Sequence, residues 1–167
     1  MQHTVELLHS YANCGVLVDS NLLLLFFLGA YDRAQIRQNT GLATFTEEDF
    51  TLLVRMLDLR QPIITTPNIL TEVSNLSNGV PELKRRAYFA SFASRLVVLK
   101  EEYVASSTAV VNRWARFGLT DAGIAEIARN RYLVLTDDFR LSQALQSDGI
   151  DTLNFNHLRD LYRRQSN

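Results

Sequence analysis

The sequence predicts an α/β protein with a mostly parallel sheet of about four to five strands, covered by helices on both faces. Short apolar runs typical of buried strands alternate with helical patterns along the chain. No internal repeat, low-complexity tract or linker interrupts this alternation. We therefore expect residues 1–167 to form one domain, with a helical extension at 1–14 and a polar tail at 156–167.

The composition is that of an ordinary globular chain, with 47% hydrophobic and 21% charged residues. Because Cys14 is the only cysteine, an intramolecular disulfide is impossible, and we expect a cytoplasmic protein. The most apolar run, Leu22 to Leu28, is far shorter than the roughly 20 residues of a membrane-spanning helix, so no membrane partner is expected. The net charge of −1 does not indicate which class of partner the protein binds, so local clusters of charge have to decide this.

In the first half, two predicted strands are each followed by helical segments. Thr46-Glu47-Glu48-Asp49 resembles a capping box with Asp in place of Glu or Gln, and Pro67 suits the first turn of a helix. Ser20-Asn21 is of capping type and opens a largely buried helix that fades around Arg37. The predicted strands are 15–18 and 62–66, and the predicted helices are 2–13, 22–37, 47–60 and one from Pro67 to a loop at 74–79.

The second half continues the alternation. Thr120 is a candidate cap for a helix in which Ile124, Ile127 and Ala128 form one buried stripe. A polar segment with Arg159, Arg163 and Arg164 follows the last strand. The predicted strands are 95–99, 132–136 and 151–155, and the predicted helices are 81–93, 102–114, 120–128 and 141–147.

Acidic residues fall where these elements join. Asp19 ends the first strand, the pair Asp137-Asp138 ends the fourth, Asp121 lies at a helix start, and Glu72 lies about one turn into the helix after the second strand. Because ligands bind at the carboxyl edge of open parallel sheets, we expect four acids to meet there. Taken singly, each acid has an alternative role as a helix cap, a first-turn charge or a solvated helix residue.

Clustered carboxylates raise one another's pKa, and a divalent cation offsets that cost. An all-oxygen ligand set favours Mg²⁺ or Mn²⁺, whereas zinc usually recruits histidine or cysteine. His3, His9 and His157 lack metal-ligand spacing, and Cys14 has no partner cysteine. Mg²⁺ commonly bridges carboxylates to phosphate oxygens, so the predicted chemistry is phosphoryl transfer or phosphodiester hydrolysis.

At these residues the sequence resembles the PIN-domain nucleases. The matching segments, in the family's order, are V-L-V-D-S-N at 16–21, T-P-N-I-L-T-E at 66–72, L-T-D-A at 119–122 and V-L-T-D-D-F at 134–139. The resemblance extends from about Gly15 to Phe155. It implies a three-layer α/β/α sandwich and a Mg²⁺- or Mn²⁺-dependent ribonuclease. The acidic quartet that it implies is Asp19, Glu72, Asp121 and Asp138, with Asn21 and Thr136 as supporting polar residues.

The resemblance also implies partners and leaves one ligand open. Many small bacterial members are toxins of toxin–antitoxin modules and are often dimeric, which implies an antitoxin protein and a homodimer here. The Thr-x-Asp spacing from Thr136 selects Asp138 as the last metal ligand, whereas another register selects Asp137. The long interval between Asp19 and Glu72 and the added N-terminal helix indicate a divergent branch.

Basic residues near the acids are candidates for binding substrate phosphates. Arg113 and Arg116 precede the helix of Asp121, and Arg140 directly follows the acidic pair; the alternative for all three is an ordinary solvated surface. Trp114 and Phe117 have either a base-stacking role or a core role. Lys84, Arg85, Arg86 and Arg95 form a second basic group; a solvated helix face is the preferred interpretation for 84–86.

Two functions from different classes are carried forward. The leading hypothesis is a metal-dependent endoribonuclease that cleaves single-stranded or looped RNA, and the alternative is a non-catalytic PIN-like module that binds RNA or a protein. A phosphatase of the haloacid-dehalogenase type is disfavoured, because that family needs Asp-x-Asp-x-Thr after its first strand and Asn21 stands at the second Asp position.

Overall fold

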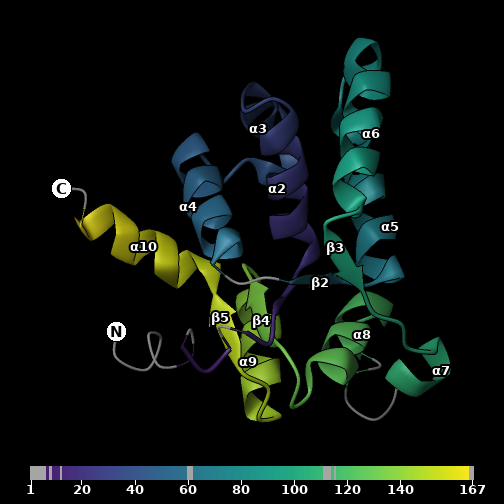
Figure 1. The fold of residues 1–167 in the computed structure, drawn as a ribbon, viewed down its shortest axis with the longest axis vertical. Helices are drawn as coiled ribbons and strands as arrows, with labels where there is room; N and C mark the ends of the chain where they lie inside the picture. Colours follow the sequence, from purple (N-terminus) through teal and green to yellow (C-terminus); the bar gives the residue numbers. More distant parts are fainter. Residues whose placement is uncertain are drawn as a thin grey trace.

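A computed structural model describes residues 7, 9–11, 13–59, 62–110, 114 and 116–165. Its five strands form one parallel sheet in the order β3-β2-β1-β4-β5 (Figure 1). The strands are β1 (Val16–Val18), β2 (Ile63–Thr65), β3 (Leu99–Glu101), β4 (Leu133–Thr136) and β5 (Thr152–Asn154). The predicted fold class is thereby confirmed: a parallel α/β sheet between two helical layers.

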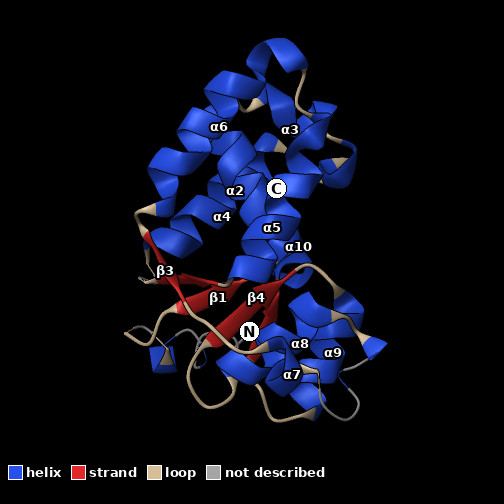
Figure 2. Cartoon of the chain, turned by 90° about the vertical axis from the view of Figure 1, so that its right-hand side faces the viewer, coloured by secondary structure: helices blue, strands red, loops and turns tan. Residues whose placement is uncertain are grey.

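The helices divide between the two faces of the sheet, as Figure 2 shows. This division follows from right-handed crossovers, because the chain moves from β1 to β3 in one direction and then returns past β1 to β4 and β5 in the other. One layer holds α2 (Ser20–Tyr31), α3 (Ala34–Gln38), α4 (Glu47–Asp58), α5 (Pro67–Leu76) and α6 (Glu82–Leu96). The other holds α7 (Ser106–Ala109), α8 (Leu119–Ala128) and α9 (Phe139–Ser147). Two short 3₁₀ turns lie between helices of the first layer: η1 (Thr40–Leu42) joins α3 to α4, and η2 (Ser77–Gly79) joins α5 to α6.

Helix α2 forms the centre of the larger layer. Its apolar residues are buried on nearly all sides, because α4, α5 and α6 pack around it. At Gly29 the crossing with α4 is so close that a β-carbon would lie 2.3 Å from the ring of Phe50, so any side chain there would force the helices apart. The predicted buried helix is confirmed, although it ends at Tyr31 and α3 forms the remainder of the predicted segment.

Two helix starts confirm their local signals. The side chain of Thr46 accepts from the Asp49 amide while the Asp49 carboxylate accepts from the Thr46 amide, which is the predicted capping box. Pro67 stands at the first position of α5, and the Thr66 side chain caps that helix.

The predicted third strand is displaced. Helix α6 extends through Leu96, and β3 begins only at Leu99. The apolar pair Val97-Val98, which indicated a buried strand, is exposed to solvent, with 83% and 56% of each residue accessible. β3 is an edge strand with one neighbour, so it carries the charged residues Lys100 and Glu101 instead of a continuous apolar run.

Two predictions for the following segment are also wrong. Glu102 extends the β2–β3 ladder by donating its amide to the Thr65 carbonyl at 2.9 Å, so the helix predicted from 102 begins only at Ser106 and is a single turn. Thr120 does not cap α8, because Gly118, with a φ of +96° that favours glycine, ends the preceding turn and the helix begins at Leu119. The predicted loop at 74–79 is instead the end of α5 and η2.

The predicted polar tail is a helix, α10 (Phe155–Gln165), which lies beside α4 (Figure 1). Arg159 anchors it, since this 7% exposed residue pairs with the buried Asp49 at 2.8 Å. Much of the predicted N-terminal helix lies outside the described residues. In the part of the chain that the structure describes, no helix is long and apolar enough to cross a membrane.

Candidate active site

The strand order reverses at the β1–β4 pair, and the candidate site lies at the carboxyl ends of these two strands. In an open parallel sheet the connections leave such a pair toward opposite faces, which opens a crevice for ligands. Asp19 directly follows β1, and Asp137-Asp138 directly follow β4. The predicted acids therefore occupy the place where this topology puts binding sites.

Asp19 is only 7% exposed, and hydrogen bonds hold both of its carboxylate oxygens. Oδ1 accepts from the Ser20 amide at 2.6 Å, and Oδ2 accepts from the Thr136 hydroxyl at 2.5 Å. The Thr136 hydroxyl in turn accepts from the Asp138 amide at 3.0 Å. Thr136, predicted as a supporting residue, thus links the acids that follow the two central strands.

Glu72 lies on α5 and Asp121 on α8, which belong to opposite layers. The two acids come near each other because α5 and α8 pack against each other at this edge. The Glu72 side chain is exposed, and its Oε2 accepts from the Ser20 hydroxyl at 2.8 Å. Asp121 lies in the first turn of α8 and is partly buried. Sequence reasoning treated Ser20 only as a capping residue and missed this hydrogen bond, which spans 52 residues.

The four acids of the predicted quartet are close enough to act on one another electrostatically. Burial raises the pKa of Asp19 to about 6; hydrogen bonds from Thr136 and Ser20 oppose the rise, and Asp137 and Glu72 add to it. Burial is also the main reason why the pKa of Asp121 rises to about 7, and the charges of Asp19, Asp138 and Glu72 raise it further. Such mutual repulsion marks a place that favours a positively charged ligand.

The two consecutive aspartates after β4 have different surroundings. Asp138 is exposed and caps α9, because its Oδ1 accepts from the amides of Arg140 and Leu141 at 2.7 and 3.0 Å. Asp137 is half-buried, and burial raises its pKa while a hydrogen bond from Asn21 opposes the rise. Asp138 acts on Asp121, whereas Asp137 acts on Asp19, so both carboxylates face the cluster.

A polar network from the end of the chain supports Asp137 and was missed at the sequence level. Asn156 donates its amide to the Asp137 carbonyl at 2.7 Å, and Arg159 donates to Asn156 Oδ1 at 2.8 Å. Asn154 lies beside Thr136 in the β4–β5 register. The parallel register could have indicated Asn154 as a neighbour of the site, but Arg159 and Asn156 were assigned to a tail.

The donor set is compatible in kind with a hard divalent cation. Its carboxylates present oxygen atoms, and two buried oxygens at this edge of the sheet, Thr65 Oγ1 and Asp137 Oδ1, have no hydrogen-bond partner among the described residues. Within the described ranges, however, no group of three or more His, Cys, Asp or Glu side chains is already placed to hold a metal ion. Ligation would therefore require the carboxylates to move closer together.

Of the candidate phosphate-binding arginines, Arg140 is near enough to the acids to act on Asp121. The guanidinium carbons of Arg116 and Arg140 stand 5.1 and 4.9 Å from the centre of the Phe117 ring. The charge of Arg140 reaches Asp121 and opposes the rise of its pKa. Arg113, the third predicted arginine, lies outside the described residues. Trp114 is buried and donates to Asp148 Oδ2 at 2.7 Å, which confirms a core role for its side chain.

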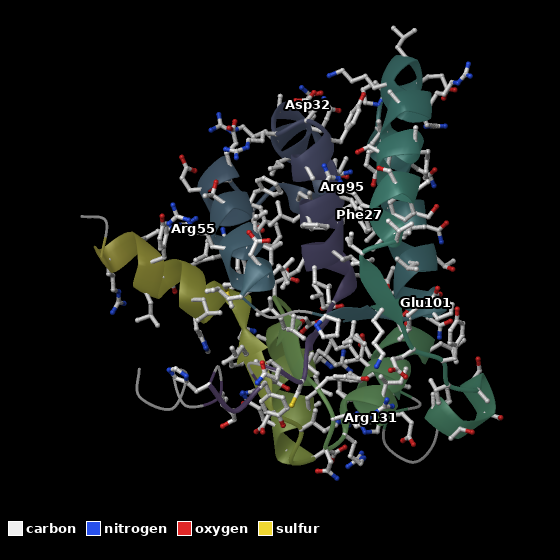
Figure 3. All side chains as sticks on the ribbon, viewed as in Figure 1. Phe27, Asp32, Arg55, Arg95, Glu101 and Arg131 are labelled. Carbon is white, nitrogen blue, oxygen red and sulfur yellow. The ribbon has the colours of Figure 1, made fainter. Side chains whose placement is uncertain are left out.

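The second basic group takes part in helix packing. Lys84 pairs with Asp32 at 2.9 Å, Arg85 pairs with Glu82 at 3.0 Å, and Arg95 donates to the Ala30 carbonyl at 3.2 Å. Figure 3 shows Arg95 next to Phe27, between α2 and α6. The contacts of Lys84 and Arg95 connect α6 to the end of α2, and that of Arg85 lies within α6, so none of them is at the acidic edge.

The geometry thus gathers acids from both layers at the switch point of the sheet, with Arg140 alongside. Such a site can bind a cation and a phosphate group next to each other. Comparisons with models of protein families, with curated proteins and with solved structures found no match to this chain. The resemblance to the PIN-domain nucleases therefore stays an expectation, carried by the four quoted segments and the residues that they place.

Proposed function

We propose that the protein is a Mg²⁺- or Mn²⁺-dependent endoribonuclease. The observation that carries the proposal is the placement of Asp19, Asp137 and Asp138 at the carboxyl ends of β1 and β4. Burial raises the pKa of Asp19 and of Asp121, and the charge of Glu72 adds to both rises. A divalent cation would offset the repulsion among such acids.

Each residue has a defined task in this proposal. Asp19, Glu72, Asp121 and Asp138 would hold the cation, and Asp137 is the alternative to Asp138. The Thr136 hydroxyl and the Ser20 amide fix the orientation of the Asp19 carboxylate through the hydrogen bonds described above. Asn21 orients Asp137 in the same way. When bound, the cation would lower the pKa of a coordinated water and polarise the scissile phosphate.

Single-stranded or looped RNA is the proposed substrate, because unpaired segments can enter an acidic crevice that excludes an intact duplex. The role of toxin in a toxin–antitoxin module, a homodimeric state and an antitoxin partner follow from the PIN resemblance and belong to the same proposal. A cytoplasmic location, expected from the single cysteine, belongs to it as well. The non-catalytic binding module remains the second candidate, favoured by the absence, among the described residues, of a preassembled metal-holding group.

The direct test compares the wild type with Asp19→Asn in cleavage of unstructured RNA in the presence of Mg²⁺. We expect the rate to fall roughly a thousandfold or more, which is the scale for losing a group that stabilises charge in the transition state. Glu126→Gln is the matched control, since Glu126 is an exposed acid on α8, the helix of Asp121. Cleavage by Asp19→Asn at the wild-type rate would overturn the proposal.

Thermal unfolding with and without Mn²⁺ separates the two candidate functions. A cation that binds only the folded state, at about 100 times its Kd, stabilises that state by about 2.7 kcal/mol. The proposed nuclease should show this stabilisation in the wild type and in Glu126→Gln but lose it in Asp19→Asn. Equal behaviour of all three proteins would favour the non-catalytic module.

A further inference from the structure

A basic hollow lies between the segment before α8 and one side of α9. Its volume is about 230 Å³, and it is lined by Arg116, Phe117, Arg140, Gln143, Ala144 and Ser147. The four α9 residues recur at the spacing of a single helical face, so the whole stripe is turned toward residues 116–117. None of the acids that the structure describes lines the hollow, but Arg140, which does, lies only two residues after Asp138, and its charge reaches Asp121.

The two arginines of the hollow form no direct ion pair among the described residues. Neither Arg116 nor Arg140 forms an ion pair within 4.0 Å in the described part of the chain, although seven ion pairs involve other basic residues there. Both guanidinium groups lie over the same phenyl ring and line the same hollow. An anion in the hollow would meet both positive charges.

Phe117 orients the arginines and is itself held in place. Its ring centre is 5.1 Å from that of Trp114, which is buried and hydrogen-bonded to Asp148. The guanidinium groups of Arg116 and Arg140 lie over the Phe117 ring, so its π system already forms cation–π contacts with them. The base-stacking role considered from the sequence is therefore less consistent with this geometry than a role in presenting two arginines to a phosphate group.

We propose that Arg116 and Arg140, supported by Phe117 and joined by Gln143, form a subsite for a backbone phosphate of an unpaired RNA strand, next to the phosphate at the acids. This inference rests on the proposed ribonuclease function. Arginine forks match phosphate oxygens in a bidentate manner, and the Gln143 amide adds a further donor. By holding one phosphate beside Asp121 and Asp138, the subsite would draw a polyanion toward carboxylates that otherwise repel it.

The test measures binding separately from cleavage. Asp19→Asn protein in EDTA is titrated against a short fluorescein-labelled oligouridylate, and fluorescence anisotropy is followed over a range of salt concentrations. In this background, adding Arg116→Gln or Arg140→Gln should each weaken binding roughly tenfold, the scale of one charge-assisted hydrogen bond. Each change should also reduce the slope of log K against log salt by about 0.7, the value for one lost phosphate contact to a single strand.

Arg86→Gln serves as the matched control, because it removes the same charge from an exposed position on α6 in the other layer. Arg140→Lys keeps the charge without the planar fork and should recover only part of the affinity. The inference is overturned if Arg116→Gln and Arg140→Gln behave like Arg86→Gln in proteins whose circular dichroism is unchanged. It is also overturned if inorganic phosphate, at the same phosphate concentration, competes as well as unlabelled oligouridylate, because a strand would then have no advantage over a free anion.

Failure of this inference differs from failure of the proposed function. If the arginine variants bind RNA like the control while wild-type protein cleaves RNA and Asp19→Asn does not, the subsite is wrong and the nuclease stands. If the subsite binds the strand as expected but wild-type protein cleaves no RNA, the nuclease is wrong.

Discussion

Asp19 and Asp49 are two buried aspartates that the protein treats in opposite ways. Both stand at helix N-termini and both are less than 10% exposed, at 7% and 3%. Asp49 pairs with Arg159 at 2.8 Å and with Arg163 at 3.3 Å, so the fold itself supplies its counterions. Asp19 has hydroxyl and amide donors and is surrounded by other acids. The contrast teaches that two similarly buried aspartates differ in whether the fold supplies a counterion, and Asp19, which lacks one among the described residues, is the one we propose for function.

The largest effect on stability should come from removing the charge of Asp49. Asp49→Asn leaves Arg159 buried without its partner, and breaking such a pair costs about 3–5 kcal/mol. Urea unfolding measures this loss. Asp58→Asn, an exposed change at the other end of α4, should cost far less. A small loss in Asp49→Asn, similar to that in Asp58→Asn, would mean that Arg159 finds another counterion and that the contrast with Asp19 is weaker than the geometry indicates.

A second effect concerns the pH dependence of stability in metal-free protein. The pKa of Asp19 is about 6 in the folded state against an ordinary 3.8, so its contribution to stability is fully present below about pH 3.8 and is lost as pH rises through about 6. The difference between the two pKa values corresponds to about 3 kcal/mol.

The measurement is the unfolding free energy of wild type and Asp19→Asn in EDTA between about pH 4 and 8. Relative to the variant, the wild type should lose stability as pH rises across this window, because the buried carboxylate must ionise next to Asp137 and Glu72. Asp151→Asn is the control, a change of another aspartate near the sheet that is partly buried. If the difference in unfolding free energy between wild type and Asp19→Asn stays constant with pH, the pKa of Asp19 is not raised in the folded state.

The sequence was sufficient for features that depend on neighbours along the chain. The acids at strand ends, the Thr46/Asp49 capping box and Pro67 at a helix start are local signals, and each lies where it was predicted. β3 and Thr120 were misplaced for a related reason: an apolar pair and a capping-type residue satisfy local rules, but the edge position of the strand and the backbone of Gly118 decide the boundary.

Features that depend on distant contacts were not predictable in this way. The hydrogen bond from Ser20 to Glu72 and that from Asn156 to Asp137 join residues far apart in the chain. Helix α10 was taken for a polar tail because its arginines dominate the segment, although Phe155 and Leu158 recur at helical spacing and pack on the core. The buried ion pair between Arg159 and Asp49 adds a long-range contact that no sequence pattern reveals. The same pair links the two regions compared above, since Arg159 also donates to Asn156, which holds the Asp137 carbonyl.

The smallest effect should come from Arg163, the outer partner of Asp49. Its side chain is 51% exposed, whereas that of Arg159 is 8% exposed, so water already solvates the Arg163 charge. We expect Arg163→Gln to cost at most about 1 kcal/mol in urea unfolding, the range of solvent-exposed pairs. Arg164→Gln, an exposed change one residue along α10, gives the baseline for that helix. If Arg163→Gln instead lowers the free energy of unfolding as much as Asp49→Asn does, Asp49 depends on both arginines equally, and a buried counterion such as Arg159 has no advantage over an exposed one such as Arg163.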